Sequence, residues 1–355
     1  MKKPGNTLLK TLCMTLLLAL TATAGHAAIN GKPVILVHGF QYEHLGNYPN
    51  TAQLEQDASL YWQDYWLSRA EAVFYWSSAE RINGGIADQI RTQVRQLADA
   101  GTCQAGCVVV THSTGDLVTR HMLRNLNGWL WQWGYGPDRF QVTAVIDLAG
   151  AGGGTELANL GVSVIDSNNL ITSAATTVVN WFLGTNAGPG ELGVVYDLQP
   201  AVARNTAIHN SAVPRLRFVG AGDTFARLTK PFILGYDDSV VPLHSACGSI
   251  LAERVESCSS QIRTDGKVTS VSRAPTGLWH NHYPVLMGDK TDHFEIISAQ
   301  RSGKLVPVVN QQNLGGLNLN FVEEQYWSWW YWGTMRFVQN SDQKSFSANI
   351  FDTLN

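Results

Sequence analysis

The sequence predicts an α/β protein built on a mostly parallel central sheet that helices cover on both faces. Short runs of apolar residues recur along the chain, and segments with helical periodicity separate them. Strands that are apolar at every position are typical of sheets buried on both faces, because neither side of such a strand meets water. Alternation of such strands with helices favours parallel pairing, since the chain must cross back over the sheet between them.

Five apolar runs supply the predicted strands: Val34–Val37, Ala72–Trp76, Cys107–Val110, Val142–Leu148 and Arg215–Val219. Apolar residues at helical spacing follow the second run: Ile86, Ile90, Val94 and Leu97. Gly101 ends this predicted helix, and a second helix is predicted from about Thr114 to Leu126. Both helices lie between strands, as the crossovers of a parallel sheet do.

The alternation stops between Thr155 and Pro214, in a region rich in Ala, Val, Leu and Asn. We expect an insertion over the sheet at about 155–213, which is either a lid or a plain pair of packing helices. The last part, about 300–355, is expected to be a Trp-rich C-terminal extension. Both belong to a single domain that spans 28–355.

The first 27 residues are expected to be a secretory signal peptide. Lys2 and Lys3 precede an apolar run from Leu12 to Leu20, and small residues follow as far as Ala27. A basic start, a short apolar core and a small-residue exit are the parts of such a signal, and the run is too short to span a bilayer. We therefore expect a secreted or periplasmic protein with no transmembrane segment.

The charge balance argues against nucleic acid as a partner. The formal net charge is −3 at pH 7, and removal of Lys2, Lys3 and Lys10 with the signal peptide would lower it to about −6. No basic run remains that could follow a phosphate backbone.

Four cysteines follow the signal peptide, and an even number in an exported chain favours disulfides. Four cysteines allow three pairings, of which we expect the two local bridges, Cys103–Cys107 and Cys247–Cys258. A Cys-x3-Cys pair also occurs in metal sites, but no His or Cys partner stands nearby at zinc-like spacing. No metal is therefore predicted at these cysteines.

The stretch VVVTHSTGDLV, residues 108–118, holds a candidate nucleophile, Ser113. A serine hydroxyl needs a base and an exposed position, and a strand, a sharp turn and a helix supply that position when small residues flank the serine. Gly115 is such a residue, but Thr111 stands where glycine is usual, which predicts a slightly wider turn or a smaller neighbour. The alternative is a structural serine at the end of a strand.

The stretch VILVHGF, residues 34–40, is a candidate oxyanion-binding loop. A His-Gly pair after the first central strand typically leads to a backbone N–H that points at the substrate oxygen. The N–H groups of Phe40 and Thr114 are the predicted donors. His38 is expected to hold the loop.

Together these stretches resemble the α/β-hydrolase superfamily, and more closely its secreted bacterial triacylglycerol lipases and esterases. Residues 142–159, VTAVIDLAGAGGGTELAN, add to the resemblance, because those lipases carry a glycine-rich turn and a Gly-Ser/Thr-Glu-x-Ala segment, here Gly154–Ala158. The usual Pro-His before it is replaced by Gly-Ala-Gly. The resemblance covers about residues 33–297 and implies the α/β-hydrolase fold with a Ser–acid–His triad in that chain order.

The resemblance places the acid after Ser113, where two stretches compete. GYDDSVVPLHSACG contains Asp238 before Val-Val-Pro and is similar to the lipase pattern, whereas RFVGAGD places Asp223 directly after a predicted strand. We expect Asp238 to orient the base and stabilise its cation, with Asp223 and then Asp237 as the alternatives.

His293 is the base that the resemblance implies, since DKTDHFEII sets it on a polar loop just before an apolar helical start. His282 is the runner-up, and His244 and His280 are further candidates. No cofactor is expected. Some secreted lipases bind a structural calcium beside this loop, and Glu295 is a candidate ligand, but no second ligand is evident and no metal is predicted.

Twelve tryptophans are many for this length, and two clusters stand out, at 129–133 and 326–332. They fit a lipid-facing surface, a sugar-stacking platform, a grip on an insoluble polyester, or ordinary aromatic packing. The resemblance implies a secreted serine hydrolase that cleaves carboxylic esters of lipids through an acyl-enzyme. The alternatives are a polyester (polyhydroxyalkanoate-like) depolymerase with the same triad, and a non-catalytic lipid- or carbohydrate-binding protein on a hydrolase scaffold.

Overall fold

The structure, a computed structural model, describes residues 28–167, 172–206, 211–223, 227–301, 303–308, 313–314 and 317–355. The expected signal peptide, at 1–27, lies outside the described residues. Within these described ranges, no helix is both long enough and apolar enough to cross a membrane.

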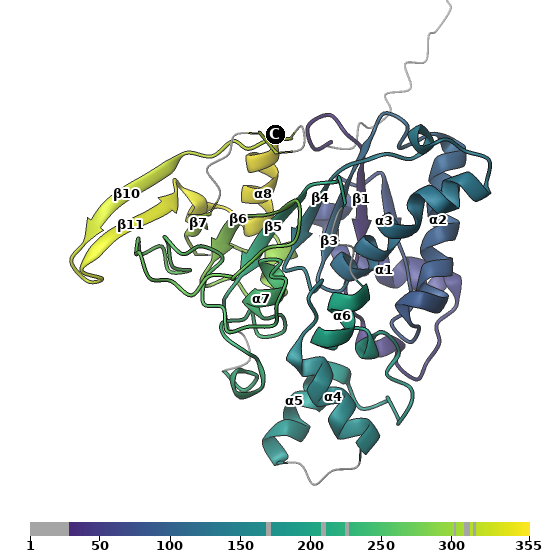
Figure 1. Cartoon of the computed structure of the whole chain (residues 1–355), viewed down its shortest axis with the longest axis horizontal. Helices are drawn as coiled ribbons and strands as arrows, with labels where there is room; N and C mark the ends of the chain where they lie inside the picture. The colour runs from purple at the N-terminus through teal and green to yellow at the C-terminus, as the bar shows by residue number, and fades with distance from the viewer. Residues whose placement is uncertain are drawn as a thin grey trace, which may run out of the picture.

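A seven-stranded sheet forms the centre of the molecule, in the order β2-β1-β3-β4-β5-β6-β7 (Figure 1). The strands are β1 (Val34–Val37), β2 (Ala72–Phe74), β3 (Cys107–His112), β4 (Val142–Leu148), β5 (Arg215–Gly220), β6 (His282–Gly288) and β7 (Leu305–Pro307). The first six pair in parallel, and β7 pairs with β6 antiparallel. All five predicted strands are confirmed, although β2 ends at Phe74, before the predicted Trp76, and β3 continues to His112.

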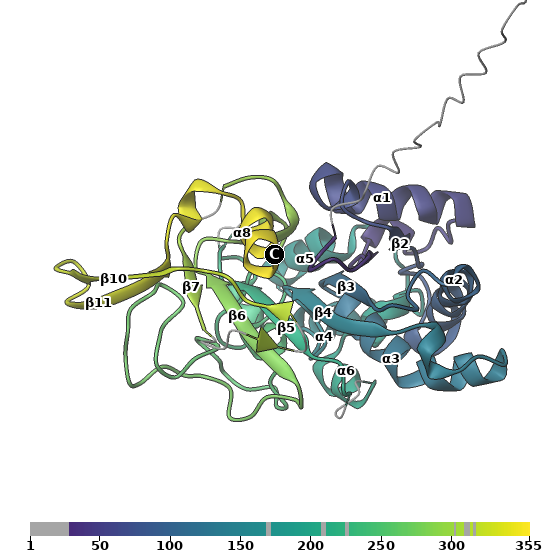
Figure 2. The ribbon, with the colours of Figure 1, turned by 90° about the horizontal axis from the view of Figure 1, so that it is seen from above.

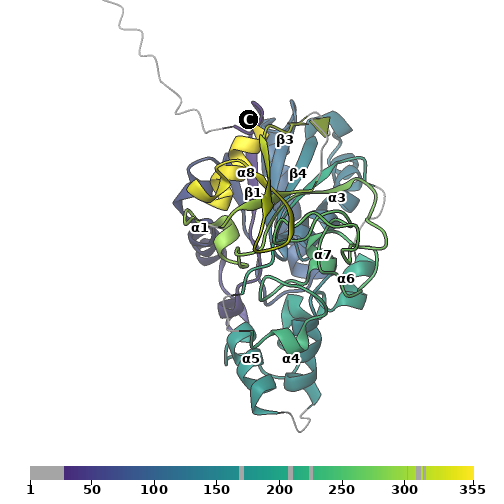
Figure 3. The same cartoon turned by 90° about the vertical axis from the view of Figure 1, so that its left-hand side faces the viewer.

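Helices cover both faces of this sheet (Figures 2 and 3). On one face lie α1 (Thr51–Leu67) and α8 (Phe346–Leu354), and on the other lie α2 (Ala87–Ala100) and α3 (Gly115–Gln132). Side chains alternate along β1, so Val34 and Leu36 join the core beneath Trp62 of α1, whereas Ile35 joins the core beneath Ile90 of α2. The predicted two-sided burial of the strands is confirmed.

Local residues set the ends of these helices. Asn50 precedes α1, and its side-chain oxygen accepts from the backbone N–H of Gln53 at 3.0 Å, which satisfies a donor that the first helical turn leaves free. Gly101 ends α2 as predicted, with a φ of 73° that favours glycine.

The region between β4 and β5 contains α4 (Glu156–Ser167), α5 (Ser173–Leu183) and α6 (Pro200–Thr206). In Figure 1, α4 and α5 pack side by side below the sheet, beyond the carboxyl ends of its parallel strands. The short helix α7 (Leu243–Ala246) follows β5. Short helical turns complete this inventory: η1 (Tyr42–His44), η2 (Ile82–Ile86), η3 (Pro137–Arg139), η4 (Gly193–Tyr196), η5 (Lys230–Phe232), η6 (Glu295–Ile297) and η7 (Ser341–Gln343).

The C-terminal part, from β7 onward, adds one strand to the central sheet and also forms two separate two-stranded sheets. After β7 come the short pair β8 (Asn313–Leu314) and β9 (Leu317–Asn318) and the hairpin β10 (Glu323–Ser328) and β11 (Gly333–Val338). This hairpin extends away from the body at the left of Figure 1, whereas α8 returns to the sheet.

Both expected disulfides are present. Cys103 and Cys107 bridge the turn between α2 and β3, with an S–S distance of 2.10 Å. Cys247, directly after α7, pairs with Cys258 at 1.97 Å. The choice of the two local pairings is confirmed.

Candidate active site

The chain has the α/β-hydrolase fold that the resemblance implied, and Ser113 occupies the turn between β3 and α3. Its φ is 56°, in the left-handed region that a residue with a side chain adopts only when its surroundings impose it. Those surroundings are two backbone hydrogen bonds, from Ser113 N to Leu148 O at 3.1 Å and from Ala151 N to Ser113 O at 2.8 Å. The turn is therefore pinned between β4 and the loop that follows β4.

Two glycines make room for this turn. A Cβ on Gly115 would lie 2.3 Å from the carbonyl oxygen of Val37, and a Cβ on Gly39 would lie 2.7 Å from the Cβ of Ser113. Thr111, the departure from the usual pattern, is fully buried, and its hydroxyl donates to the carboxylate of Asp147 on β4. The threonine therefore has a polar partner of its own beneath the turn.

His293 and Asp238, the predicted base and acid, are hydrogen-bonded to each other. His293 Nδ1 and Asp238 Oδ2 are 2.8 Å apart, and the two residues also bond through the backbone, His293 N to Asp238 O, at 3.0 Å. The other carboxylate oxygen of Asp238 accepts from Val240 N at 3.1 Å and from Val241 N at 2.7 Å. Asp238 is fully buried, so these donors replace water around its charge.

The rival carboxylates face other partners. Asp223 is partly exposed and pairs with Arg227, four residues on, at 3.3 Å. Asp237 pairs with Lys230 at 3.0 Å and accepts from Ser239 N at 2.9 Å.

Two of the rival histidines are also held by other partners, and the third is exposed. His282 bonds Arg217 at 3.0 Å, His244 bonds Glu156 at 2.7 Å, and His280 is exposed.

The loop after β1 carries Phe40, one of the two residues whose N–H groups were expected to bind the oxyanion, and His38 orients this loop. His38 stacks on Trp76 with ring centroids 4.7 Å apart, and burial lowers the pKa of His38 to about 3, so its ring is neutral. Trp76 N donates to His38 Nε2 at 3.3 Å, which leaves the proton on Nδ1 to donate to the carbonyl oxygen of Gly39 at 2.8 Å. Because C=O and N–H point in opposite directions across a trans peptide, His38 turns the N–H of Phe40 away from itself.

Among the hydrogen bonds of the described residues, none uses the N–H of Phe40 or of Thr114. Both residues line the same cavity as Ser113. These two donors are therefore available to an oxygen bound beside the serine.

Tyr61 and His112 connect the loop after β1, the turn at Ser113 and the loop that carries His293, and no sequence pattern predicted either role. The hydroxyl of Tyr61, on α1, lies 2.5 Å from His112 Nδ1 and also hydrogen-bonds the backbone of Gly39. His112 Nε2 lies 2.8 Å from the carbonyl oxygen of His293. A carbonyl only accepts, so Nε2 carries the proton and Nδ1 accepts from Tyr61, and burial, which lowers the pKa of His112, keeps the ring neutral.

A cavity of about 410 Å³ opens above these groups. Its polar end is formed by Ser113, Thr114 and His293. Most of the other residues that line it are apolar or aromatic: Phe40, Tyr42, Tyr61, Ala151, Trp181, Phe182, Leu198, Val240, Val241, Phe294 and Ile297. Trp181 and Phe182 come from α5, so the expected insertion supplies one wall of the cavity.

A cluster of fully buried charges lies behind the turn. Asp116, in the first turn of α3, pairs with Arg215 at 2.5 Å and with Arg217 at 2.6 Å, and Asp147 pairs with Arg215 at 3.2 Å. Burial acts to raise the pKa of Asp116, but the guanidinium groups of Arg217 and Arg215 outweigh it and lower that pKa. The cluster ties the start of α3 to β4 and β5, and removal of one partner would leave a buried charge uncompensated.

Within the described residues, no group of three His, Cys, Asp or Glu side chains is arranged to hold a metal ion. Glu295, the candidate calcium ligand, instead accepts from the backbone N–H of Asp292 at 3.3 Å.

No family model matches the chain, and no curated protein matches it. Among solved structures, the mature Bacillus licheniformis lipase BlEst2 is 17% identical, with 77% of this chain and 89% of that chain covered and a TM-score of 0.43. Clostridium botulinum EstA is 12% identical, with 77% and 84% covered and a TM-score of 0.40. The chain spans less than half of Legionella pneumophila phospholipase PlaB, with 61% and 45% covered, 16% identity and a TM-score of 0.36. Likeness at this level carries no functional conclusion, which has to come from the site itself.

Proposed function

We propose that the protein is a serine hydrolase that cleaves carboxylic esters with an apolar acyl group, as a lipase or esterase does. The observation that carries this proposal is the pairing of His293 with the buried Asp238 at the rim of the cavity that also holds Ser113. A binding protein has no need of a strained serine, a carboxylate-oriented histidine and two free backbone donors in one place.

The reaction begins when His293 Nε2 takes the hydroxyl proton of Ser113 and Ser113 Oγ attacks the ester carbonyl carbon. The carbonyl oxygen becomes an oxyanion, and the N–H groups of Phe40 and Thr114 stabilise it. Asp238 accepts from Nδ1 of the imidazolium and so stabilises the positive charge on His293.

The tetrahedral intermediate then collapses. The ester C–O bond breaks, His293 gives its proton to the leaving alcohol oxygen, and an acyl group remains on Ser113 Oγ. In the second half, His293 takes a proton from water, the hydroxide attacks the acyl carbon, and Ser113 regains its proton as the acid leaves.

The cavity favours an apolar acyl chain over a charged one. Most of its wall is built from Phe, Trp, Val, Leu and Ile side chains, and among the described residues that line it Glu43 is the one acidic side chain and none is Lys or Arg. We therefore propose uncharged acyl esters, with triacylglycerols among them, as the substrate class.

Hydrolysis of chromogenic butyrate and palmitate esters, with and without an emulsion, tests this function. Ser113→Ala is the decisive variant, and Ser260→Ala, at an exposed serine, is its matched control. Removal of a triad member lowers kcat by about 10⁴-fold or more, so Ser113→Ala should lose turnover and Ser260→Ala should keep it.

The acyl preference separates the substrate classes. Palmitate turnover that rises with the emulsion supports a lipase, whereas turnover of butyrate alone supports an esterase for small esters. Turnover that survives in folded Ser113→Ala, or no turnover by the folded wild type on any uncharged ester, would contradict the proposal.

A further inference from the structure

The hairpin of β10 and β11, residues 323–338, carries an unusual tip. The sequence from 326 to 332 reads Tyr-Trp-Ser-Trp-Trp-Tyr-Trp, and each of its six aromatic side chains is exposed: Tyr326, Trp327, Trp329, Trp330, Tyr331 and Trp332. Trp330 is 92% exposed and Trp329 is 75% exposed. We call the hairpin the arm and these six residues the aromatic tip. Such a dense exposed apolar patch marks a contact site, since a protein that gains nothing from it would lose solubility.

The arm holds its tip in a fixed position. The strand β10 pairs with β11 from Glu323–Val338 to Ser328–Gly333. The outer edge of β11 is bonded in turn by the loop at 266–268, through Val268 N to Thr334 O at 2.8 Å and Arg336 N to Gly266 O at 2.9 Å. The strand β11 is therefore bonded on both of its edges, by β10 and by this loop, which fixes the direction in which the arm presents its tip.

Charge is graded along the arm. At its base, Glu324 pairs with Lys304, and Glu323 pairs with Arg336 at 3.5 Å. From Gln325 to Met335 there is no charged residue. A charged base beneath an uncharged aromatic tip matches the change from water to the headgroup region of a lipid layer, where Trp and Tyr rings are favoured.

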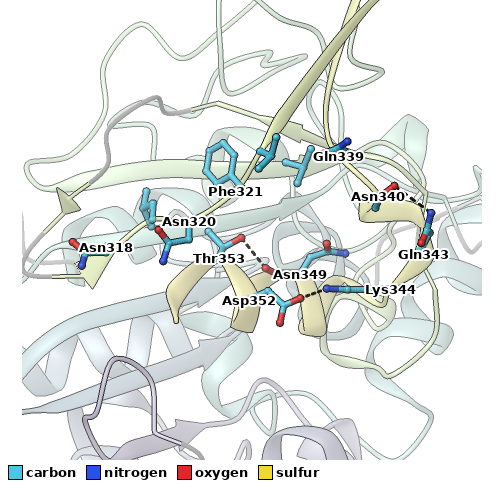
Figure 4. A pocket seen from close by; sticks show the side chains of 13 residues that line it. Asn318, Asn320, Phe321, Gln339, Asn340, Gln343, Lys344, Asn349, Asp352 and Thr353 are labelled. Atoms are coloured by element: carbon cyan, nitrogen blue, oxygen red, sulfur yellow. Dashed lines mark hydrogen bonds and ion pairs between the residues drawn. The ribbon is translucent and has the colours of Figure 1, made fainter.

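A polar cavity lies at the base of the arm (Figure 4), and its position bears on whether the aromatic tip binds a sugar or a lipid. A glycan site needs hydrogen-bonding groups beside its stacking rings. In this cavity of about 770 Å³, Gln343 bonds Asn340 at 3.2 Å, and Lys344 pairs with Asp352 at 2.5 Å. These polar groups lie at the base of the arm and not beside the aromatic tip, which favours lipid over sugar as the occupant of the tip.

We propose that the aromatic tip inserts into an uncharged or zwitterionic lipid–water interface and anchors the protein there. The net charge of −3 gives no attraction to anionic lipid, so the rings themselves supply the affinity. This anchor is independent of the reaction at Ser113 and holds whether or not the protein hydrolyses esters.

Flotation of the full chain with phosphatidylcholine vesicles tests the anchor. A diether phosphatidylcholine is the probe, because it contains no ester and cannot be hydrolysed during the assay. The test variant is Trp329→Ser combined with Trp330→Ser and Trp332→Ser, and the single variant Trp330→Ser accompanies it. The matched control is Trp131→Ser, at a tryptophan of α3 that is 79% exposed but lies outside the arm.

The wild type and Trp131→Ser should float with the vesicles, and added salt at about 0.5 M should not release them, because the tip is uncharged. The vesicle partition coefficient of the triple variant should fall by at least about tenfold, since loss of about 60 Å² of buried apolar surface gives that factor and one aromatic ring buries more. Trp330→Ser, at the most exposed position, should show a smaller fall in the same direction.

Three results would overturn the proposal. The first is a wild type that does not float, and the second is a triple variant that floats as well as Trp131→Ser does. The third is a wild type that does not bind vesicles but binds insoluble polysaccharide, or forms a dimer through the tip. In either case the triple variant would lose that interaction. Circular dichroism of each variant checks that the fold is kept.

Discussion

His112 Nε2 donates to the carbonyl oxygen of His293 at 2.8 Å, so the residue before the candidate nucleophile holds the backbone of the candidate base. Tyr61 completes the connection, because its hydroxyl bonds both His112 Nδ1 and the backbone of Gly39 in the oxyanion loop. One hydrogen-bonded path therefore links the oxyanion loop, the turn at Ser113 and the loop that carries His293, and the proposed reaction needs these three to keep fixed relative positions.

Replacement of Tyr61 by Phe tests this path. Tyr61→Phe keeps the ring and leaves two buried partners without a hydrogen bond, which costs about 1–3 kcal/mol each. We expect kcat on a soluble butyrate ester to fall by about tenfold, with a smaller change in KM, because the loops lose their register. Tyr65→Phe, on the same helix and outside this path, is the control. Equal kcat values in the two variants would refute the positioning role.

The acid of the triad can be identified by two amide variants. Asp238→Asn should lower kcat by about 10⁴-fold with little change in KM, because the histidine loses the partner that stabilises its cation and sets its tautomer. Asp223→Asn, at a carboxylate paired with Arg227, should keep full activity. The reverse result would move the acid to Asp223.

Two glycine-to-alanine variants separate crowding from helix propensity. In Gly39→Ala the new Cβ would meet the Tyr61 hydroxyl and the Cβ of Ser113, so both kcat and the unfolding midpoint should fall. In Gly128→Ala the Cβ meets nothing within 4 Å and lies within α3, so the free energy of unfolding should rise by about 0.5–1 kcal/mol. Denaturant unfolding measures the stability of both variants, and ester hydrolysis measures the kcat of Gly39→Ala. A Gly39→Ala variant that is as stable and as active as the wild type would refute the close packing.

Stability should fall in mild acid. Burial lowers the pKa of His38 from 6.5 to about 3, so between these values the unfolded chain binds a proton that the folded chain does not. The contribution of His38 to the free energy of unfolding is therefore complete above about pH 6.5 and is lost progressively toward about pH 3.

Other buried groups titrate too, among them Asp147, whose pKa burial raises. The readout is therefore the difference in slope between the wild type and His38→Asn, measured by denaturant unfolding from about pH 7 to about pH 4. The variant should show a shallower slope, and identical slopes would exclude a buried neutral His38.

The local pattern predicted most of the sheet, and it missed elements whose signal is not local. Five strands were predicted because each contains an apolar run that can be recognised from its own residues. The strand β6 begins with His282, Tyr283 and Pro284, which leaves it an apolar run of only three residues, 285–287, and the antiparallel β7 has only three residues in all, so both signals are short. The helix α1 has a weak apolar stripe and a break at Gln63, where φ is 55°.

The sequence by itself indicated the apolar strands and their alternation with helices, the turn that holds Ser113, the two local disulfides and the short list of acids and bases, because each of these patterns can be recognised in short stretches of the chain. The tertiary structure alone decided that Asp238 and not Asp223 meets His293, and that Tyr61, His112 and His293 share one path across separations of 51 and 181 residues. It also decided that the aromatic tip stands free of the core, whereas Trp62 and Trp66 lie within it. The physical reason is that hydrogen bonding and burial depend on distance in space, and spacing along the chain constrains that distance only within one turn, helix or hairpin.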